Sequence, residues 1–597
     1  MRNHQQLFLF VIALLVGVSM TSGENPERVG YRASKFGKYV GYSQPLYDEW
    51  LRTSRYIEMS DGVKLAVDII WPAKNGKPVE KSLPVVWNYY RYHRAREQDG
   101  KILSMVDRAP PLQMLVKHGY VIVVVDARGT GVSYGSHDKG PNTSDQARDI
   151  YEITEWIAAQ SWCDGNVGMF GHSYSGYIQF RAAGQAPPHL KAIFPSMATF
   201  DLYEIMYRGG VFGDKFAQGA RHSLNYWDIE TPAPPVDEDS AGEMLAETRA
   251  EHRKNVDPYV FLKTYTYRDT RKNDLVFWIE NNPRTYVKEV NESGIPVYQW
   301  AGWYDFNIRD MFQWFANLRT PQKLTIGPWS HASYDWDDLL GIEQLRWFDY
   351  WLKGIENGIV DEPAINYALI RGDDVGEWHS ADDWPLPTAE NTSFFFNSGP
   401  SGSIHSVNDG VLSMQQPTGD KGHDKYTVDY SATSEEDDMS TNDAKGLTFT
   451  SVSIEDDITI IGHPVITLYV TSTTEDVDFY AYLEEVDARG TSKCITTGII
   501  RASHRAFKEP PFDNLGLPYH RHFAADIRPL RKDEVAELKF DLLPISRIFR
   551  KGNRIRVTIT CADKSYTEER QLDPPPTVKL YHNKRLASYI SLPIVKT

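Results

Sequence analysis

The sequence predicts an α/β protein with a mostly parallel sheet, followed by a separate all-β domain. Near-continuous Val and Ile runs, such as residues 119–126, are separated by stretches with helical periodicity. Strands of this kind are typical of a parallel sheet covered on both faces. Beyond residue 358, short alternating strands separated by turn residues dominate, which is typical of a β-sandwich. A chain of 597 residues also exceeds what one hydrophobic core organises, so we expect several domains.

The N-terminus has the layout of a signal peptide. Arg2 is followed by an apolar run over residues 7–18 and by small and polar residues up to Gly23. The run is shorter than the ~20 residues that a spanning helix needs. We therefore expect residues 1–23 to be removed and the mature protein to be secreted or periplasmic, without a stable membrane span. An uncleaved membrane anchor is the alternative.

The composition is that of an acidic globular protein. The formal net charge is −16 and no basic block offsets it, which disfavours binding to nucleic acid. Acidic residues 435–438 are expected to form a solvated loop, because no metal-ligand spacing accompanies them. The three cysteines are too few and too widely spaced for a disulfide framework or a metal site: Cys163, Cys494 and Cys561. Three sequons would matter only in a host that glycosylates: Asn142, Asn291 and Asn391.

Residues 24–199 are predicted to form the first part of the α/β core. A hairpin is expected over residues 56–71, with its turn at Asp61-Gly62. Apolar strands follow at residues 83–87 and 119–126. Residues 144–159 carry their apolar side chains on one face, which predicts an amphipathic helix leading into the next strand.

A glycine-flanked serine, Ser173, follows that strand and predicts a tight strand-to-helix turn. Gly171 and Gly176 supply the residues without bulk that a close approach of strand and helix requires. The spacing departs from the usual Gly-x-Ser-x-Gly pattern, because Ser175 stands at the fifth position and the glycine comes one residue later. An ordinary turn with a buried serine is the alternative to a nucleophile elbow.

The residues on either side of this turn favour the elbow. Residues 167–170 can form the strand, and residues 175–183 the helix, with Gly184 as its cap. The resulting order of strand, helix, strand, elbow and helix is that of an α/β-hydrolase core.

The remaining chain divides into three segments. Residues 200–290 show aromatic and charged residues at helical spacing and are predicted to form a helical cap over the site. Residues 291–358 return to the core with strands over 295–305 and 323–331. Residues 359–597 are predicted to form the all-β sandwich. Its clearest expected strands are 365–371, 393–397, 464–471, 479–485 and 554–560.

A serine nucleophile needs a histidine base and a carboxylate that orients this histidine. In α/β-hydrolases both follow the serine in the chain, each just past a core strand. Asp305 and His331 stand at those places, so we predict the triad Ser173, Asp305 and His331. A polar cap at a strand end is the alternative for each partner taken alone. His172 adjoins the serine and is expected to have a packing role.

Hydrolysis of an acyl bond also needs hydrogen-bond donors where the oxyanion forms. The backbone N–H of Tyr174, directly after the serine, is the first candidate. A phenolic hydroxyl from Tyr89 or Tyr90, after strand 83–87, is the second. Trp303 and Phe306 are candidates for an apolar substrate pocket.

These motifs resemble the bacterial cocaine-esterase and X-Pro dipeptidyl-peptidase family of serine hydrolases. The motifs that carry the resemblance are Trp162-Cys-Asp-Gly-Asn-Val-Gly-Met-Phe170, Gly171-His-Ser-Tyr-Ser-Gly176, Ala301-Gly-Trp-Tyr-Asp305, Gly327-Pro-Trp-Ser-His331 and Asp382-Asp-Trp-Pro-Leu-Pro387. The resemblance implies the same triad, a helical cap, a C-terminal jelly roll and no cofactor. The oxyanion-binding tyrosine of the family's Asn-Pro-Tyr segment falls on Tyr90. Tyr89 replaces the proline, so Tyr89 remains the alternative donor.

The resemblance leaves the substrate open among small esters, amides and peptides. Related α-amino-acid ester hydrolases and cephalosporin acylases are alternatives, and the former grip an ammonium with a carboxylate cluster. No such cluster is evident beside Asp305, and Glu204 in the cap is a candidate that the sequence does not place. A catalytically silent protein that binds a carbohydrate or a partner is the alternative from another class. The sequence makes no prediction of oligomeric state.

Overall fold

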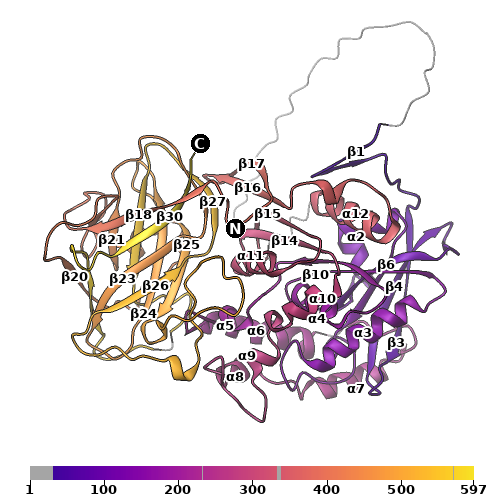
Figure 1. Cartoon of the computed structure of the whole chain (residues 1–597). Helices are drawn as coiled ribbons and strands as arrows, with labels where there is room; N and C mark the ends of the chain where they lie inside the picture. The colour runs from indigo at the N-terminus through magenta and orange to yellow at the C-terminus, as the bar shows by residue number, and fades with distance from the viewer. Residues whose placement is uncertain (1–30, 232, 333–337, 569, 597) are drawn as a thin grey trace, which may run out of the picture.

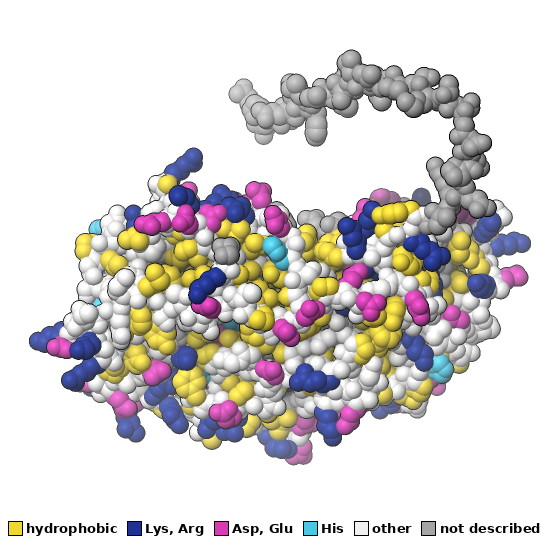
Figure 2. All heavy atoms as spheres, turned by 45° about the horizontal axis from the view of Figure 1, so that its top comes forward, with side chains coloured by type: hydrophobic (Ala, Val, Ile, Leu, Met, Phe, Trp, Pro, Cys, Tyr) yellow, Lys and Arg dark blue, Asp and Glu magenta, His cyan; other side chains and the backbone are white. Residues whose placement is uncertain are grey.

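The computed structural model describes residues 31–231, 233–332, 338–568 and 570–596 (Figure 1). The predicted signal peptide lies outside these ranges. Within them, no helix combines the length and apolar character that crossing a membrane requires. On the face drawn in Figure 2, acidic and basic side chains are interspersed, and the coloured residues form no continuous basic area.

The core is a mixed sheet with an antiparallel hairpin at one edge and a run of parallel strands. The predicted hairpin is confirmed and is longer than expected, and its turn includes Gly62 at φ 84°. The strands follow in the order β3 (Glu49–Glu58), β4 (Lys64–Lys74), β9 (Val121–Asp126), β6 (Leu83–Tyr90), β10 (Cys163–His172), β11 (Leu190–Ser196), β14 (Val297–Tyr304), β15 (Gln322–Ser330) and β16 (Ile365–Arg371). Because β10 lies inside the sheet, the turn that follows it stands at the middle of the sheet's carboxyl edge.

Helices cover both faces of this sheet, as the apolar strands predict. One face packs against α3 (Ser144–Ala158), α4 (Tyr174–Gln185) and α11 (Ile308–Asn317). The other packs against α2 (Pro110–Lys117) and α12 (Asp338–Lys353). The prediction that Gly184 caps α4 is wrong. The helix continues to Gln185 and ends at Ala186 in the left-handed conformation, while Gly184 faces α10 (Val287–Ser293).

The segment between β11 and α10 forms the predicted, mostly helical cap. Figure 1 shows α5 and α6 between the core and the sandwich. The elements of the cap include α5 (Leu202–Met206), the short hairpin β12 (Tyr207–Arg208) and β13 (Val211–Phe212), α6 (Asp214–Asn225), the π-helix η1 (Tyr226–Glu230), α7 (Glu243–His252), α8 (Pro258–Lys263) and α9 (Phe277–Glu280).

The C-terminal part is a mostly antiparallel β-sandwich around its own apolar core. Four expected strands are confirmed: β18 (Ala389–Asn397), β23 (Val465–Ser472), β24 (Asp478–Val486) and β28 (Arg554–Thr560). The strands that the sequence left unassigned include β19 (Gly410–Ser413), β20 (His423–Thr427), β21 (Leu447–Thr450), β22 (Ile458–Gly462), β25 (Ser492–Arg501), β26 (Ala536–Asp541), β27 (Ile545–Phe549), β29 (Thr577–Tyr581) and β30 (Tyr589–Val595). Acidic residues 435–438 are exposed between strands, which confirms the predicted loop.

Strand β16 corrects the division between core and sandwich. The sequence places residues 365–371 in the sandwich, but β16 pairs in parallel with β15 as the next strand of the core sheet. Its last residues, Ile370 and Arg371, also pair with β27 of the sandwich. One strand therefore belongs to both parts, because its two halves contact different neighbours.

Sequon Asn142 is unsuited to glycosylation in the folded chain. Its side chain is fully buried and donates to the carbonyl of Asn281 at 2.5 Å. Asn391 is exposed, and Asn291 is partly buried. The three cysteines are free.

Candidate active site

The turn after β10 has the geometry of a nucleophile elbow. Ser173 lies at φ 59° and ψ −118°, a conformation that L-residues rarely adopt and that strains the backbone. A Cβ on Gly171 would lie 2.6 Å from the Cβ of Ser175, and one on Gly176 would lie 2.5 Å from the carbonyl oxygen of Ser196. Both glycines are therefore required for the close approach of strand and helix, as predicted.

The structure brings the three predicted triad residues together. The Oγ of Ser173 lies 2.9 Å from Nε2 of His331, and Nδ1 of His331 lies 2.6 Å from Oδ2 of Asp305. Asp305 and His331 directly follow the adjacent parallel strands β14 and β15, whose carboxyl ends meet at the same sheet edge as β10. This shared edge explains how residues far apart in the chain form one hydrogen-bonded row.

The carboxylate and the imidazole of this row differ in exposure. Asp305 is 2% exposed, and its second oxygen accepts a bond of 2.6 Å from the backbone N–H of Asn307. The His331 side chain is 25% exposed, so its ring is partly accessible while the carboxylate of Asp305 is enclosed. Such an arrangement fixes the orientation of the imidazole through a buried charge.

His172 contributes more than the packing expected of it. Its Nε2 lies 3.1 Å from the backbone carbonyl of His331, and the two rings are 4.7 Å apart. Burial, and then the neighbouring His331, lower the pKa of His172 to about 3. At neutral pH it is therefore an uncharged ring that holds the loop carrying His331.

The strand alternation separates the two tyrosines that the sequence left as alternatives. Tyr89 is fully buried, and its hydroxyl donates to Asp149 at 3.0 Å and accepts from the N–H of Arg128 at 2.9 Å. Tyr90 points to the other side and lines the cleft beside the elbow. The N–H of Tyr174, at the first position of α4, has no acceptor within the helix and is available to a ligand.

The two candidate pocket residues have different environments. The Phe306 ring lies 4.3 Å from the His331 ring and 5.0 Å from the ring of Phe216 in the cap, which places it at the site. The prediction that Trp303 lines the pocket is wrong. Its indole is buried and donates to the carbonyl of Ala368 at 2.8 Å, because its strand position faces the interior and β16.

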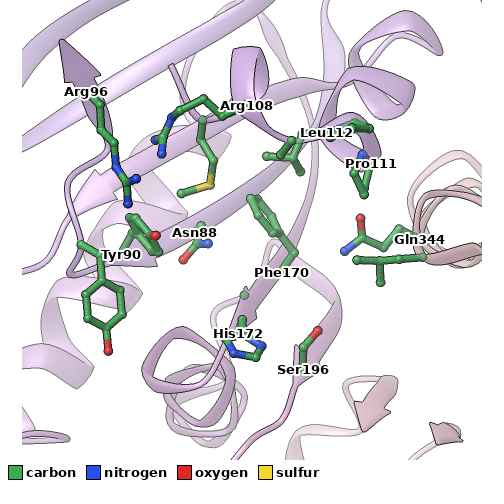
Figure 3. Close-up of a pocket in the computed structure, with 16 residues that line it drawn as sticks. Asn88, Tyr90, Arg96, Arg108, Pro111, Leu112, Phe170, His172, Ser196 and Gln344 are labelled. Atoms are coloured by element: carbon green, nitrogen blue, oxygen red, sulfur yellow. The ribbon is translucent and has the colours of Figure 1, made fainter. Parts of the chain in front are cut away.

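A cleft of about 470 Å³ adjoins the elbow. Figure 3 shows it between the β6 end, the segment that carries Arg96 and Arg108, and α12. Its described lining includes Tyr90, Phe170, His172 and Ser196, and no carboxylate is among these described residues.

Glu204 lies elsewhere, in a buried cluster between cap and sandwich. Its carboxylate is 3.2 Å from Arg268 and 3.0 Å from His522. Among the described residues, no group of three His, Cys, Asp or Glu side chains is arranged to hold a metal ion.

The fold and the row of serine, histidine and aspartate define a serine hydrolase with an α/β-hydrolase core. The chain belongs to the X-Pro dipeptidyl-peptidase (S15) family, whose model matches residues 61–333. The model of the X-Pro dipeptidyl-peptidase C-terminal non-catalytic domain matches residues 357–590. The family predicted from the motifs is thereby confirmed.

Individual relatives extend over nearly the whole chain. A Mycobacterium bovis protein named "Putative serine esterase" is 32% identical over 92% of this chain and 96% of its own length. The cocaine esterase of a Rhodococcus species is 26% identical over 90% of this chain and 98% of its own. A crystal structure of a CocE/NonD family hydrolase from Staphylococcus aureus shares the fold, with a TM-score of 0.72, 22% identity and coverage of 92% and 94%.

Proposed function

We propose that this protein hydrolyses ester or amide bonds through an acyl-enzyme on Ser173. The observation that carries the proposal is the hydrogen-bonded row in which Ser173, His331 and Asp305 are joined at 2.9 and 2.6 Å. The strained elbow supports it, since it presents the Ser173 hydroxyl at the sheet edge.

Each step of the reaction has a residue suited to it. His331 Nε2 takes the proton of Ser173 as the oxygen attacks the carbonyl carbon, and Asp305 stabilises the resulting imidazolium. The N–H of Tyr174 and the hydroxyl of Tyr90 donate to the oxyanion. His331 then protonates the leaving group, and a water activated by the same imidazole releases the acid.

Within the family, the site favours an esterase over a dipeptidyl peptidase. A dipeptidyl peptidase binds a free ammonium, and a desolvated cation needs a carboxylate partner. The described lining of the cleft offers none, and Glu204 is already paired with Arg268 and His522. The acylase alternative has no observation in its favour beyond the shared fold.

The first test is the hydrolysis of short p-nitrophenyl acyl esters by the purified mature chain. We expect p-nitrophenol release that Ser173→Ala removes, together with covalent labelling of Ser173 by a fluorophosphonate. Full activity of the Ala variant would overturn the elbow assignment.

A matched pair of peptides separates esterase from peptidase. Ala-Pro-p-nitroanilide is offered with a free and with an acetylated N-terminus, beside a p-nitrophenyl ester. We expect brisk ester hydrolysis and little anilide turnover. A strong preference for the free amine would contradict the esterase assignment.

The protein is also proposed to be exported. Support comes from the sequence, where Arg2 precedes the apolar run of residues 7–18. Expression of the full chain should yield a secreted or periplasmic protein that begins near residue 24, and N-terminal sequencing checks this. A cytoplasmic full-length product in an exporting host would refute it.

A further inference from the structure

The segment between β6 and α2 carries four arginines in an otherwise acidic protein: Arg91, Arg94, Arg96 and Arg108. Two of them are matched by carboxylates. Arg91 lies 3.0 Å from Asp228 of the cap. Arg94 lies 2.8 Å from Asp68 and 2.9 Å from Asp126, with all three side chains fully buried.

The other two, Arg96 and Arg108, form no ion pair with any described residue. Arg96 lies on β7 (Ala95–Gln98), and its guanidinium is 4.6 Å from the Trp227 ring of the cap. Arg108 ends α1 (Met105–Arg108), and its Nε donates to the carbonyl of Ser104 at 3.2 Å. Its Nη2 is buried and has no hydrogen-bond partner among the residues that the structure describes.

The carboxylate next to Arg108 in the chain is committed to other groups. Asp107 accepts 2.7 Å bonds from the Trp50 indole and from both the N–H and the hydroxyl of Ser104. It therefore caps α1 and forms no ion pair with either arginine.

Both unmatched arginines line the cleft described above, and two buried amides line it with them. Figure 3 shows the guanidinium groups of Arg96 and Arg108 close together, near Tyr90 and Asn88. Asn88 and Gln344 are each 2% exposed, and within the described part of the chain the Oδ1 of Asn88 and the Oε1 of Gln344 have no hydrogen-bond partner. A buried polar atom without a partner is costly, so a cleft that keeps two of them is suited to a polar ligand.

The charges in the cleft specify the sign of that ligand. Burial, and then the positive charge of Arg96, lower the pKa of Arg108. Two guanidinium groups that repel each other in a partly enclosed cleft are stabilised by an anion between them. Carboxylates fit the planar donor fork of arginine in a bidentate manner.

The cleft reaches the predicted nucleophile. Its lining ends at Gly171 and His172, which immediately precede Ser173, and at Ser196, whose carbonyl accepts from the Ser173 N–H at 3.0 Å. Two consecutive trans peptides span at most about 7.6 Å, so the Cα of Gly171 lies within that distance of the Cα of Ser173. A carboxylate held by the arginines would thus belong to a substrate whose scissile bond lies at the elbow.

We propose that Arg96 and Arg108 form a carboxylate-binding subsite and that the preferred substrates are esters or amides that carry a second, free carboxylate. The unpartnered amide oxygens of Asn88 and Gln344 are acceptors, so they suit N–H or O–H groups elsewhere on the same substrate and not its carboxylate. The inference rests on the proposed function, because it assigns specificity to the site around Ser173.

The test compares substrates that differ only in the free carboxylate. For a carboxylate on the acyl side, the pair is p-nitrophenyl hemiglutarate and p-nitrophenyl valerate. For a carboxylate on the leaving group, the pair is 3-carboxyphenyl butyrate and phenyl butyrate. We expect a higher kcat/KM for the anionic member of one pair, which also tells on which side of the scissile bond the arginines lie.

The variant that tests the subsite is the double substitution Arg96→Gln with Arg108→Gln. Charge-assisted hydrogen bonds predict that it lowers the anionic-to-neutral ratio of kcat/KM by about tenfold to a hundredfold. Arg96→Lys with Arg108→Lys keeps the charge but loses the fork, and an intermediate ratio is expected. The control is Arg489→Gln with Arg585→Gln, two exposed arginines of the sandwich, which changes the net charge equally and should leave the ratio unaltered.

Two outcomes would overturn the subsite. One is a wild-type ratio of one or below for both pairs, and the other is the same ratio in the double Gln variant as in the wild type. Absence of any ester hydrolysis, or hydrolysis that Ser173→Ala leaves unaltered, would instead refute the proposed function.

A measurement on the wild-type protein covers the case in which the double variant does not fold. Glutarate should inhibit hydrolysis of p-nitrophenyl valerate competitively, at a concentration about tenfold lower than valeramide does. Equal inhibition by the charged and the neutral compound would contradict the proposal.

Discussion

Arginines occupy two regions of this molecule in opposite ways. In the cleft beside Ser173, Arg96 and Arg108 have no carboxylate as an ion-pair partner among the described residues. Between cap, core and sandwich, every arginine of a buried group is matched. We call this group the interfacial charge cluster, and it consists of Asp201, Glu204, Arg268, Arg309, His522 and Asp541.

The cluster joins three parts of the chain through short contacts. Arg268 lies 2.6 Å from Asp201 and bridges the cap to Glu204. Arg309 of α11 lies 2.9 Å from Asp541 of β26, which ties the core to the sandwich. His522 adds a ring nitrogen 3.0 Å from Glu204. Matched buried charges hold surfaces together in one register, and they have no capacity left for a ligand.

The comparison teaches that residue type does not distinguish the two roles, whereas the presence of a partner does. A matched arginine in the cluster is structural, and an unmatched one in the cleft is available to substrate. Substitutions in the cleft should therefore change rates, and substitutions in the cluster should change stability. The following predictions test this division, from the largest expected effect to the smallest.

Asp305→Asn should give the largest effect in the active site. The amide favours the wrong tautomer of His331, so kcat on a neutral ester should fall by about 10⁴-fold, or ~5.5 kcal/mol. Circular dichroism and thermal unfolding should show an intact fold. A loss of less than tenfold at unchanged stability would assign the acid role to another residue.

Glu204→Gln should act on stability. It leaves Arg268 and His522 without their shared carboxylate, and breaking a buried pair costs about 3–5 kcal/mol in the free energy of unfolding, measured in urea. Glu537→Gln on the exposed face of β26 is the matched control, with an expected change near zero. If Glu204→Gln left stability unaltered but abolished ester hydrolysis, the division between the two regions would fail.

Tyr90→Phe and Tyr89→Phe each remove one phenolic hydroxyl, and the two hydroxyls lie on opposite sides of β6. Loss of an oxyanion donor should lower kcat by about 10²- to 10³-fold for Tyr90→Phe. Tyr89→Phe should cost about 1–3 kcal/mol of stability, because Asp149 and the Arg128 N–H lose a partner. Steady-state kinetics and urea unfolding of both variants decide between them, and the reverse result would make Tyr89 the donor.

Acidification should loosen the region around the cluster. Burial, and then the charge of His522, lower the pKa of His504 to about 2 and the pKa of His520 to about 4. The unfolded chain takes up these protons below pH ~6.5 whereas the folded chain does not, so stability falls as pH decreases from 6.5 toward 4.

The slope is about 1.4 kcal/mol per pH unit for each fully neutral buried histidine. Urea unfolding between pH 7 and 5 measures it, and His520→Gln should make the decline shallower. A stability that rises on acidification would contradict the neutral state. The contact of 2.9 Å between the Nδ1 atoms of His504 and His522 also requires that at least one of the two rings be neutral, since two doubly protonated rings would place N–H against N–H.

Local sequence alone determined the catalytic row. Each of Ser173, Asp305 and His331 follows an apolar strand, and parallel strands deliver their carboxyl ends to one edge. The sequence also predicted the order of strands and helices along the chain, the elbow glycines and the change to short alternating strands. Each of these features depends on residues that are close in the chain.

Only the tertiary structure decided which side chains are matched. Trp303 became a buried residue because β16 lies beside its strand and accepts its indole N–H. Arg91 forms an ion pair with Asp228, which lies more than a hundred residues away in the chain. Arg96 belongs to the same short segment but forms no ion pair with a described carboxylate. Charge matching depends on partners supplied by distant elements, and neither composition nor spacing contains that information.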